Sequence, residues 1–573
     1  MIYRTEHPKP QFMRESWQNL NGEWSFEFDY GVSGVSRGLY REDAKFSRVI
    51  NVPFCPESKL SGIGETDFVN SVWYKREFDI NHEQLNGDIL LHFGAVDYEA
   101  VVYINGEECG RHKGGYVSFA LDITKFVREG KNTLTVNALD DTRSRLIPSG
   151  KQSMRYESYS CSYTRTTGIW QTVWLEFVPK ARIVKAKYAC DIESATFFIN
   201  AQLKGEGTFK VQAFFDGKFM GEGEVFSRGG SAKLSIKLHE KHLWEVGKGG
   251  LYDLVLTFGE DKVNSYFGLR SLRLDGYKFL INEKSVFQRL VLDQGFYPDG
   301  LYTAPSDDEL KADIERSVAM GFNGARLHEK VFEERFLYHA DRMGYIVWGE
   351  YPNWGLDVSY ADSIHGILPE WIEEVERDIN HPSIVGWCPF NETWNENERK
   401  QFDGVLSLVY RTTKAIDPSR PCIDTSGNYH VETDIFDVHD YDQNPESFRD
   451  RYEAFKNGSL KESNSLHQPW FTNRQQYTYG TPMFVSEYGG IRWTDDETGW
   501  GYGNAPETKE EFLTRLEGLT DVLLENPLMF GYCYTQLTDI EQEQNGLYTY
   551  DRKAKFPPEV ISKILCKKAA IED

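Results

Sequence analysis

Apolar and polar residues alternate in short runs along the first third of the chain, with turn residues between the runs. Residues 73–78, 88–93 and 100–104 are examples, and Asn105-Gly106 after the third run is typical of a tight type I′ hairpin turn. No long helical period interrupts this part. The pattern predicts a β-sandwich of the jelly-roll type over residues 1–180.

The alternation continues with smaller units from residue 181 to about residue 270. Residues 196–199, 209–215 and 252–258 have the length and polarity of strands, and Asp216-Gly217 marks a turn. A segment of this size built from such strands is typical of an immunoglobulin-like sandwich. We therefore expect a second β-sandwich over residues 181–270.

From residue 271 onward, short apolar runs alternate with amphipathic helical patterns such as 307–320, 371–379 and 509–525. This alternation predicts a (β/α)8 TIM barrel over residues 271–573, in which functional residues lie at the carboxyl ends of the strands. The eight expected strands are 287–292, 324–327, 345–348, 384–387, 421–424, 435–439, 482–486 and 531–535.

The net charge limits which partners are expected, and the terminal segment and the cysteines indicate the cellular compartment. The chain has a formal net charge of −24, so a nucleic acid or an anionic membrane, each of which needs a basic protein face, is not expected to bind. No signal-like segment begins the chain, and no apolar run is long enough to span a membrane. The eight cysteines form no Cys-x-x-Cys pair and read as reduced thiols. We expect a cytoplasmic protein.

Carboxylates at the ends of the predicted barrel strands are the candidate chemical groups. Hydrolysis of a glycosidic bond generally needs two of them, one to protonate the leaving oxygen and one to attack C1 or to activate water. Glu350, Glu392, Asp440 and Glu487 each follow a predicted strand directly or closely. Taken singly, each could equally be a capping or salt-bridging residue.

Glu392 and Glu487 lie in the most informative surroundings. Glu392 follows the fourth predicted strand, and Glu487 ends the seventh, which places the two across the mouth of a barrel. Around them, and over most of the chain, the sequence resembles glycoside hydrolase family 2. The resembling motifs are WQNLNGEW (17–24), VPF (52–54), YING (103–106), RTTGIWQTVWLE (165–176), FGLR (267–270), GFNGARLH (321–328), HPSI (381–384) with Asn391-Glu392, and SEYG (486–489).

The resemblance implies a sugar-binding-type sandwich and a retaining, exo-acting glycosidase, with Glu392 as general acid/base and Glu487 as nucleophile. It also implies that Asn391 binds the sugar 2-hydroxyl and that Tyr441 and Arg326 keep the nucleophile ionised. We expect no cofactor and no metal ion, a carbohydrate substrate, and a homo-oligomer. Further candidates for the pocket or its rim are His328, Glu350, Trp354, His439, Trp493 and Tyr534.

Two departures from the family pattern bear on the sugar. The β-galactosidases of the family carry Gly-x-Asn-x-His-Glu after strand 1, where this chain reads VLDQGFYPDGLY (291–302). The β-glucuronidases carry Asn-x-Lys, and Asn545 stands in place of that lysine. Asp293, Asp299 and Glu543 would also repel a uronate. We therefore expect a neutral sugar, as in a β-galactosidase.

Other functions stay open at this point. On the same scaffold the alternatives are a uronidase, specific for β-glucuronides or β-galacturonides, and an α-L-arabinofuranosidase. An endo-acting barrel and a carbohydrate-binding protein without activity are alternatives of other kinds, because a fold alone does not prove an activity.

Overall fold

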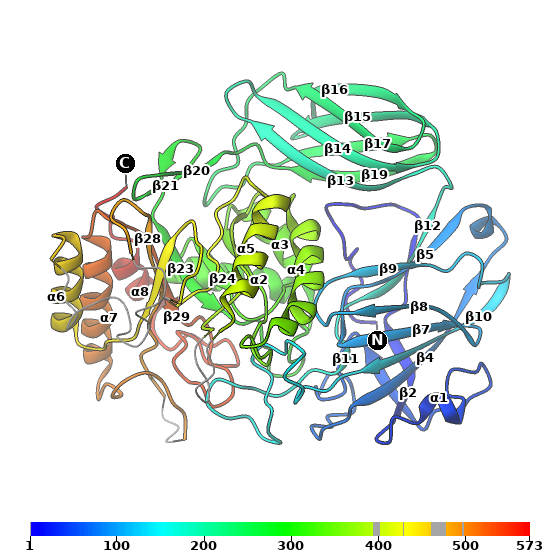
Figure 1. The fold of residues 1–573 in the computed structure, drawn as a ribbon, viewed down its shortest axis with the longest axis horizontal. Coiled ribbons are helices and arrows are strands. Elements are labelled where there is room, and N and C mark those ends of the chain that lie inside the picture. Colours follow the sequence, from blue (N-terminus) through cyan, green and yellow to red (C-terminus); the bar gives the residue numbers. More distant parts are fainter. Residues whose placement is uncertain (1, 394–400, 428, 460–476, 495–497, 573) are drawn as a thin grey trace.

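The structure, a computed structural model, describes residues 2–393, 401–427, 429–459, 477–494 and 498–572. Two β-sandwiches are followed by a curled parallel sheet surrounded by helices (Figure 1). This arrangement confirms the predicted fold class. The domain limits at residues 180 and 270 stay predictions, although the strands of the first sandwich end at Val178 and those of the second begin at Arg182.

The first sandwich consists of two antiparallel sheets, with strand orders β1-β12-β5-β9 and β3-β2-β4-β10-β7-β8. Residues such as Phe26, Leu91 and Val136 are fully buried between the sheets. Its elements are β1 (Trp17–Asn19), β2 (Gly22–Phe28), α1 (Gly34–Arg37), β3 (Arg48–Val52), β4 (Ser71–Ile80), η1 (Glu83–Asn86), β5 (Asp88–Phe93), β6 (Val96–Asp97), β7 (Glu99–Ile104), β8 (Glu107–Lys113), β9 (Phe119–Asp122), β10 (Gly130–Leu139), β11 (Gly168–Ile169) and β12 (Val173–Val178).

The second sandwich pairs a sheet of order β13-β14-β17 with a sheet of order β16-β15-β18-β19. Strand β14 shows why the sequence alternates: Phe197, Ile199 and Leu203 are buried, while the residues between them face outward. The strands are β13 (Arg182–Asp191), β14 (Thr196–Lys204), β15 (Gly207–Phe215), β16 (Lys218–Ser227), β17 (Gly230–Lys237), β18 (Tyr252–Phe258) and β19 (Asp261–Phe267).

The third part has, among the described residues, a seven-stranded parallel sheet of order β26-β25-β24-β23-β29-β28-β27. Its strands are buried on both faces because side chains fill the inside and helices cover the outside. The strands are β23 (Gln288–Asp293), β24 (Gly324–Leu327), β25 (Ile346–Glu350), β26 (Ile384–Cys388), β27 (Phe436–Asp440), β28 (Met483–Gly489) and β29 (Met529–Thr535), and a small sheet of β20 (Leu272–Asp275), β21 (Lys278–Ile281) and β22 (Lys284–Ser285) precedes them.

Seven of the eight predicted barrel strands form, and the fifth, 421–424, does not form as a regular strand. Its backbone pairs with Trp387 on β26 through two hydrogen bonds, from Ile423 N to Trp387 O (2.9 Å) and from Trp387 N to Pro421 O (3.1 Å). The Asp424 carboxylate then accepts the N–H groups of Val431 (2.6 Å) and Glu432 (2.9 Å), which turns the chain away. The segment still fills the place between β26 and β27.

Some of the helices begin at a residue whose side chain accepts an otherwise unpaired N–H group. Ser306 caps α2 by accepting from Glu309 N (3.2 Å), and Thr508 caps α7 by accepting from Glu511 N (3.1 Å). Among the described residues, no helix is long and apolar enough to cross a membrane. The helices are α2 (Asp307–Met320), α3 (Glu334–Met343), η2 (Ala361–Ser363), α4 (Ile364–Asp378), α5 (Asp403–Ile416), α6 (Pro445–Lys456), α7 (Lys509–Leu524) and α8 (Pro558–Leu565).

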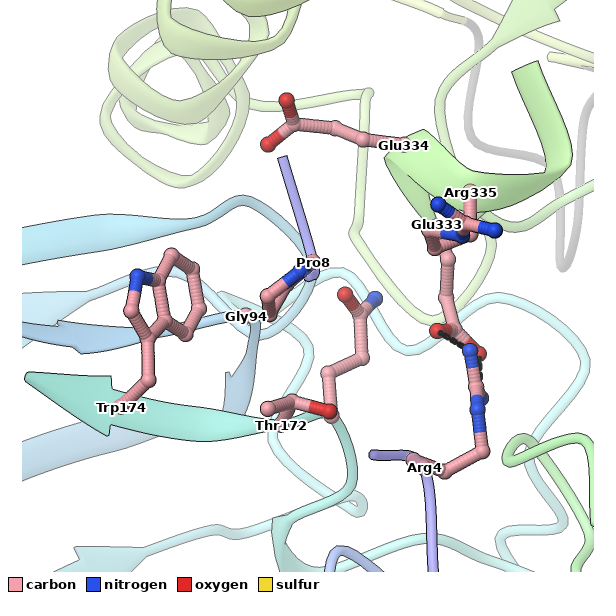
Figure 2. A pocket seen from close by; sticks show the side chains of 9 residues that line it. Arg4, Pro8, Gly94, Thr172, Trp174, Glu333, Glu334 and Arg335 are labelled. Carbon is pink, nitrogen blue, oxygen red and sulfur yellow. Dashed lines mark hydrogen bonds and ion pairs between the residues drawn. The ribbon is translucent and has the colours of Figure 1, made fainter. Parts of the chain in front are cut away.

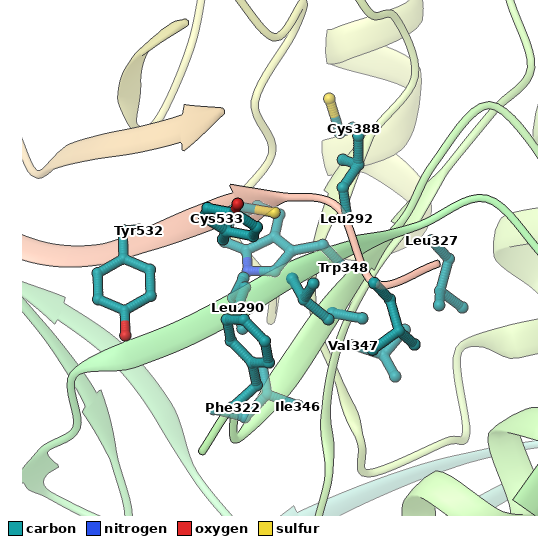
Figure 3. Close-up of a cluster of buried hydrophobic side chains, with 14 of the residues drawn as sticks. Leu290, Leu292, Phe322, Leu327, Ile346, Val347, Trp348, Cys388, Tyr532 and Cys533 are labelled. Carbon is teal, nitrogen blue, oxygen red and sulfur yellow. The ribbon is translucent and has the colours of Figure 1, made fainter. Parts of the chain in front are cut away.

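The barrel interior is filled by apolar side chains rather than open. Figure 3 shows Leu290 and Leu292 of β23 beside Val347 and Trp348 of β25 and Cys533 of β29. Packing of this kind holds the strands at fixed positions, so the residues at their carboxyl ends are held by a rigid frame.

The first sandwich is docked firmly on the barrel. Arg4 of the N-terminal segment donates to both carboxylate oxygens of Glu333, at 2.8 and 2.7 Å, beside a small pocket between the two parts (Figure 2). Glu370 of α4 accepts the backbone N–H groups of Tyr116 (2.6 Å) and Val117 (3.1 Å) in the sandwich. Because these polar groups are buried and bonded across the junction, the sandwich and the barrel hold a defined relative position.

Candidate active site

Glu392 and Glu487 lie at the carboxyl end of the barrel sheet. Glu487 is on β28, where the register with both neighbouring strands shifts at this end. Such irregularities redirect side chains at the rims of sheets. Glu392 follows β26 and has a left-handed backbone with φ of 47°, held by a hydrogen bond from its N–H to Ser426 O (2.8 Å). Strained backbone of this kind is concentrated at functional sites.

His439 connects the two carboxylates. Its Nδ1 lies 2.7 Å from Glu392 Oε1 and 3.4 Å from Glu487 Oε2. Burial lowers the pKa of His439, but the negative charge of Glu487 and the hydrogen bond with Glu392 more than offset this and raise it. One oxygen of each carboxylate and a ring nitrogen of His439 all lie within 4.8 Å of one another. A separation this short fits retaining glycosidases (about 5–5.5 Å) and not inverting ones (roughly 6.5–9.5 Å).

Glu487 is surrounded by groups that favour its ionised form. Arg326 Nη1 donates to Oε1 (3.1 Å), and the Tyr441 hydroxyl donates to Oε2 (2.5 Å). Burial alone would raise the pKa of Glu487, but the positive charges around it, first that of His439 and then those of Arg326 and Lys151, lower it to about 2. An ionised, buried carboxylate of this kind is suited to nucleophilic attack.

Replacing Tyr441 by Phe is expected to lower kcat by about 10- to 100-fold, because the donor to the nucleophile is lost. The ring itself should stay in place, since it stacks on Tyr502 at 3.4 Å between centroids. Losing the donor raises the pKa of Glu487, and protonation inactivates a nucleophile. The activity of the variant should therefore fall at a higher pH than that of the wild type when kcat/KM is followed from acid to neutral pH. An unchanged kcat, together with a fall of kcat/KM at the same acidic pH as in the wild type, would show that Tyr441 does not act on Glu487.

Arg326 is the hub of the buried hydrogen-bond network below the carboxylates. Besides Glu487, it donates to Glu350 and, through Nη2, to Asn391 Oδ1 (3.1 Å). His328 Nδ1 lies 3.0 Å from Glu350 Oε2, and burial holds the pKa of His328 well below its ordinary value, so its ring is neutral. Arg326, Asn391, Glu350 and His328 thus lie together in one buried network, and their contact with substrate stays a prediction.

The remaining sequence-predicted residues divide into two groups. Trp354 Nε1 donates to the carbonyl of Asn391 (3.1 Å), which helps to hold the segment that carries Glu392. Trp493 instead packs against Phe512 and Phe556, with its ring centroid 6.3 and 5.8 Å from theirs. Tyr534 is fully buried and packs against Phe322 and Tyr488. The structure gives Trp493 and Tyr534 packing roles, and their contact with substrate stays a prediction.

The first sandwich adds residues to the site that sequence reasoning missed. Tyr163 donates its hydroxyl to Glu543 of the barrel and accepts from Gln294 Nε2 (3.1 Å). Lys151 is buried close enough to Glu487 and Glu392 for the charges of these carboxylates to contribute to its raised pKa. No motif or periodicity marks these two residues, because their role depends on how the sandwich sits on the barrel.

Three described residues, Glu392, His439 and Glu487, have donor atoms close enough to hold a metal ion together. The same three residues form the acid–base pair and its bridging imidazole, so a metal ion bound there would occupy the groups that the chemistry needs. Two other acidic residues of β27, Asp437 and Asp440, do not join this group of possible metal ligands. Asp437 accepts from Ser426 Oγ (2.6 Å), and Asp440 pairs with Arg451.

Comparisons with known proteins show what the chain resembles. Residues 17–179 match the sugar-binding domain of glycosyl hydrolases family 2, and residues 275–494 match its TIM barrel domain. A protein of Paenibacillus borealis named β-glucuronidase is 23% identical over 96% of both chains. A Formosa agariphila protein, provisionally named a β-glucuronidase, is 26% identical over 73% of this chain and 52% of its own length, so this chain matches about half of that relative.

Among solved structures, a β-glucuronidase from Ruminococcus gnavus in complex with D-glucuronic acid superposes with a TM-score of 0.80 at 20% identity. The superposition covers 98% of this chain and 100% of the other, which shows that the two share a fold. Both domain matches belong to one family, and the matched barrel segment includes Glu392 and Glu487. The chain is therefore a member of glycosyl hydrolase family 2 and a glycosidase that hydrolyses O-glycosyl compounds.

Proposed function

We propose that the protein is a retaining exo-β-uronidase that removes a terminal β-D-glucuronosyl residue from a glycoside. The short separation of Glu392 and Glu487 supports retention, and the β-glucuronidase relatives support the uronide. The neutral, β-galactosidase-like sugar expected from the sequence is not confirmed, and the comparisons favour the uronidase alternative. The observation that carries the proposal is the close pair of carboxylates, Glu392 and Glu487, both in contact with His439.

In the first step, the Glu487 carboxylate attacks C1 and the C1–O bond to the leaving group breaks, while Glu392 gives its proton to the leaving oxygen. In the second step, Glu392 takes a proton from water as that water attacks C1, and the bond from C1 to Glu487 breaks. The sugar leaves with its original configuration. His439 lies beside both carboxylates and can stabilise the charge that moves between them.

Asn391 is suited to bind the sugar 2-hydroxyl. Its Oδ1 accepts from Arg326 Nη2, so the Nδ2 group is the part of the amide that can donate to a substrate. Its backbone is held by Asn353, whose Oδ1 accepts from Asn391 N (2.7 Å). A donor fixed from both sides can strengthen its contact as the transition state forms.

A set of 4-nitrophenyl glycosides that differ only in the sugar tests the proposal. We expect kcat/KM for the β-D-glucuronide to exceed that for the β-D-glucoside, β-D-galactoside, β-D-galacturonide and α-L-arabinofuranoside by at least about tenfold. NMR of the first product should show the β-anomer. A neutral glycoside turned over tenfold better than every uronide would exclude the uronidase, and α-product would exclude retention.

A further inference from the structure

Lys151 comes from the first sandwich, yet its side chain ends in the active site of the barrel. Its residue is only 6% exposed, and its ammonium lies 5.1 Å from the ring centroid of Trp354, the residue that holds the Asn391-Glu392 segment. The charge of the same ammonium adds to the lowering of the pKa of Glu487, and it partly offsets the burial that raises the pKa of Glu543. One lysine therefore faces the nucleophile, the acid/base segment and Glu543.

The loop that carries Lys151 is built against the barrel. Ser149 N donates to Trp354 O (2.7 Å), and Gly150 N donates to Pro352 O (3.2 Å). Gly150 has a left-handed backbone, and a Cβ there would lie 2.6 Å from Glu329 O, so only glycine allows this close approach. The position of Lys151 is thus set by the contact between sandwich and barrel and not by a free surface loop.

The Lys151 ammonium is charged. It makes no hydrogen bond within the part of the chain that the structure describes. Burial lowers its pKa, but the acidic groups around it, among them Glu543, Glu487 and Glu392, more than offset this and raise it. The Glu543 carboxylate is already bonded by Tyr163 and by Asn545 Nδ2 (3.1 Å). A buried cation of this kind has donors to spare for an anionic ligand.

Three other cations of the barrel, Arg326, Lys330 and Arg289, are committed to other groups. Arg326 is paired with Glu350 and Glu487, and Lys330 Nζ donates to Gly295 O (2.6 Å) and Tyr302 O (2.7 Å). Arg289 forms a bidentate pair with Glu572, at 2.8 Å for both bonds, beside the C-terminal residues. Of the four cations Arg326, Lys330, Arg289 and Lys151, Lys151 is the one that remains available to a ligand in the site.

We propose that Lys151 binds the carboxylate of the uronic acid sugar, so that the first sandwich supplies the charge that selects the substrate of the barrel. The inference rests on the proposed uronidase function. It assigns to Lys151 a role in specificity rather than in bond cleavage, because its charge pairs with a substrate group that does not react.

Turnover of 4-nitrophenyl β-D-glucuronide and β-D-glucoside tests this role, since the two substrates differ only in a carboxylate and a hydroxymethyl group. We expect Lys151→Met to lower kcat/KM for the glucuronide by at least about 100-fold, mainly through KM, and that for the glucoside by a factor at least about tenfold smaller, because only the effect of Lys151 on the charge of Glu487 is then lost. Lys151→Arg should retain most of the glucuronide activity. Lys125→Met, an exposed lysine of the same sandwich, is the matched control and should change neither.

Equal losses on both substrates would overturn the proposal, because they would mean that Lys151 only tunes Glu487 or the fold. A binding measurement keeps the test independent of turnover: in a Glu487→Gln background, D-glucuronate should bind more weakly by a similar factor when Lys151 is Met, and unchanged binding would again overturn it. A wild-type enzyme that prefers the glucoside would refute the uronidase function itself. A wild-type preference for the glucuronide that survives in Lys151→Met would refute only the role of Lys151.

Discussion

Replacing Glu487 by Gln is expected to lower kcat by roughly four to six orders of magnitude while the protein stays folded. The amide keeps the shape of the side chain and can keep its hydrogen bond with Arg326 or Tyr441, but it cannot attack C1. Because the covalent intermediate is the reaction path, its loss leaves only slow, unassisted hydrolysis. Steady-state kinetics together with thermal unfolding measures both effects.

Glu374→Gln is a matched control for this substitution. Glu374 is also a buried carboxylate of the barrel, on α4, and burial raises its pKa well above its ordinary value. Gln therefore resembles the form that Glu374 already has, and activity close to that of the wild type is expected. Near-normal turnover by Glu487→Gln would refute the assignment of the nucleophile.

Replacing Glu392 by Ala is expected to act differently on the two steps. With a poor leaving group the first step loses its acid, so kcat/KM should fall by about 10²- to 10⁴-fold. With 2,4-dinitrophenolate, which needs little protonation, the first step should stay fast, and the covalent sugar–enzyme intermediate should accumulate. A burst of dinitrophenolate and the mass of the intact protein report that intermediate.

Azide distinguishes the roles of the two carboxylates. In Glu392→Ala it should restore turnover by attacking the intermediate without a general base, and the product should be the β-glycosyl azide. In Glu487→Ala, the variant that lacks the nucleophile, rescue by azide should give the α-glycosyl azide. If Glu392→Ala were the variant that gave the α-product, the two assignments would be exchanged.

Much of the fold was predictable because local chemistry and tertiary packing agree. Helix α2 begins after Ser306, whose hydroxyl caps it, and ends before Gly321, which adopts a left-handed backbone with φ of 103°. The predicted bounds 307–320 are those observed. The fifth strand was harder to predict, because the bonds of Asp424 to the backbone beyond it compete with regular pairing and leave no signal in apolar periodicity.

The catalytic pair was predictable because strand ends can be found from periodicity, and the barrel brings these ends together. His439 was predicted as a pocket residue for the same reason, although its bridging position between Glu392 and Glu487 depends on the register shift after Val438. Lys151 and Tyr163 were not predictable, because they lie in a different domain, far from the barrel in sequence. Their relevance comes from a docking contact that no local pattern encodes.

The docking of the loop at Ser149 and Gly150 onto the barrel means that the catalytic machinery and the selection of the substrate need not change together. Substitutions in a sandwich loop can alter which sugars are accepted while the buried network around Arg326 stays intact. Related proteins can thus come to act on different sugars while the barrel keeps its stability. The same division suits protein engineering, in which substitutions of Lys151 would vary the recognition of the sugar while the strands that carry Glu392 and Glu487 stay unchanged.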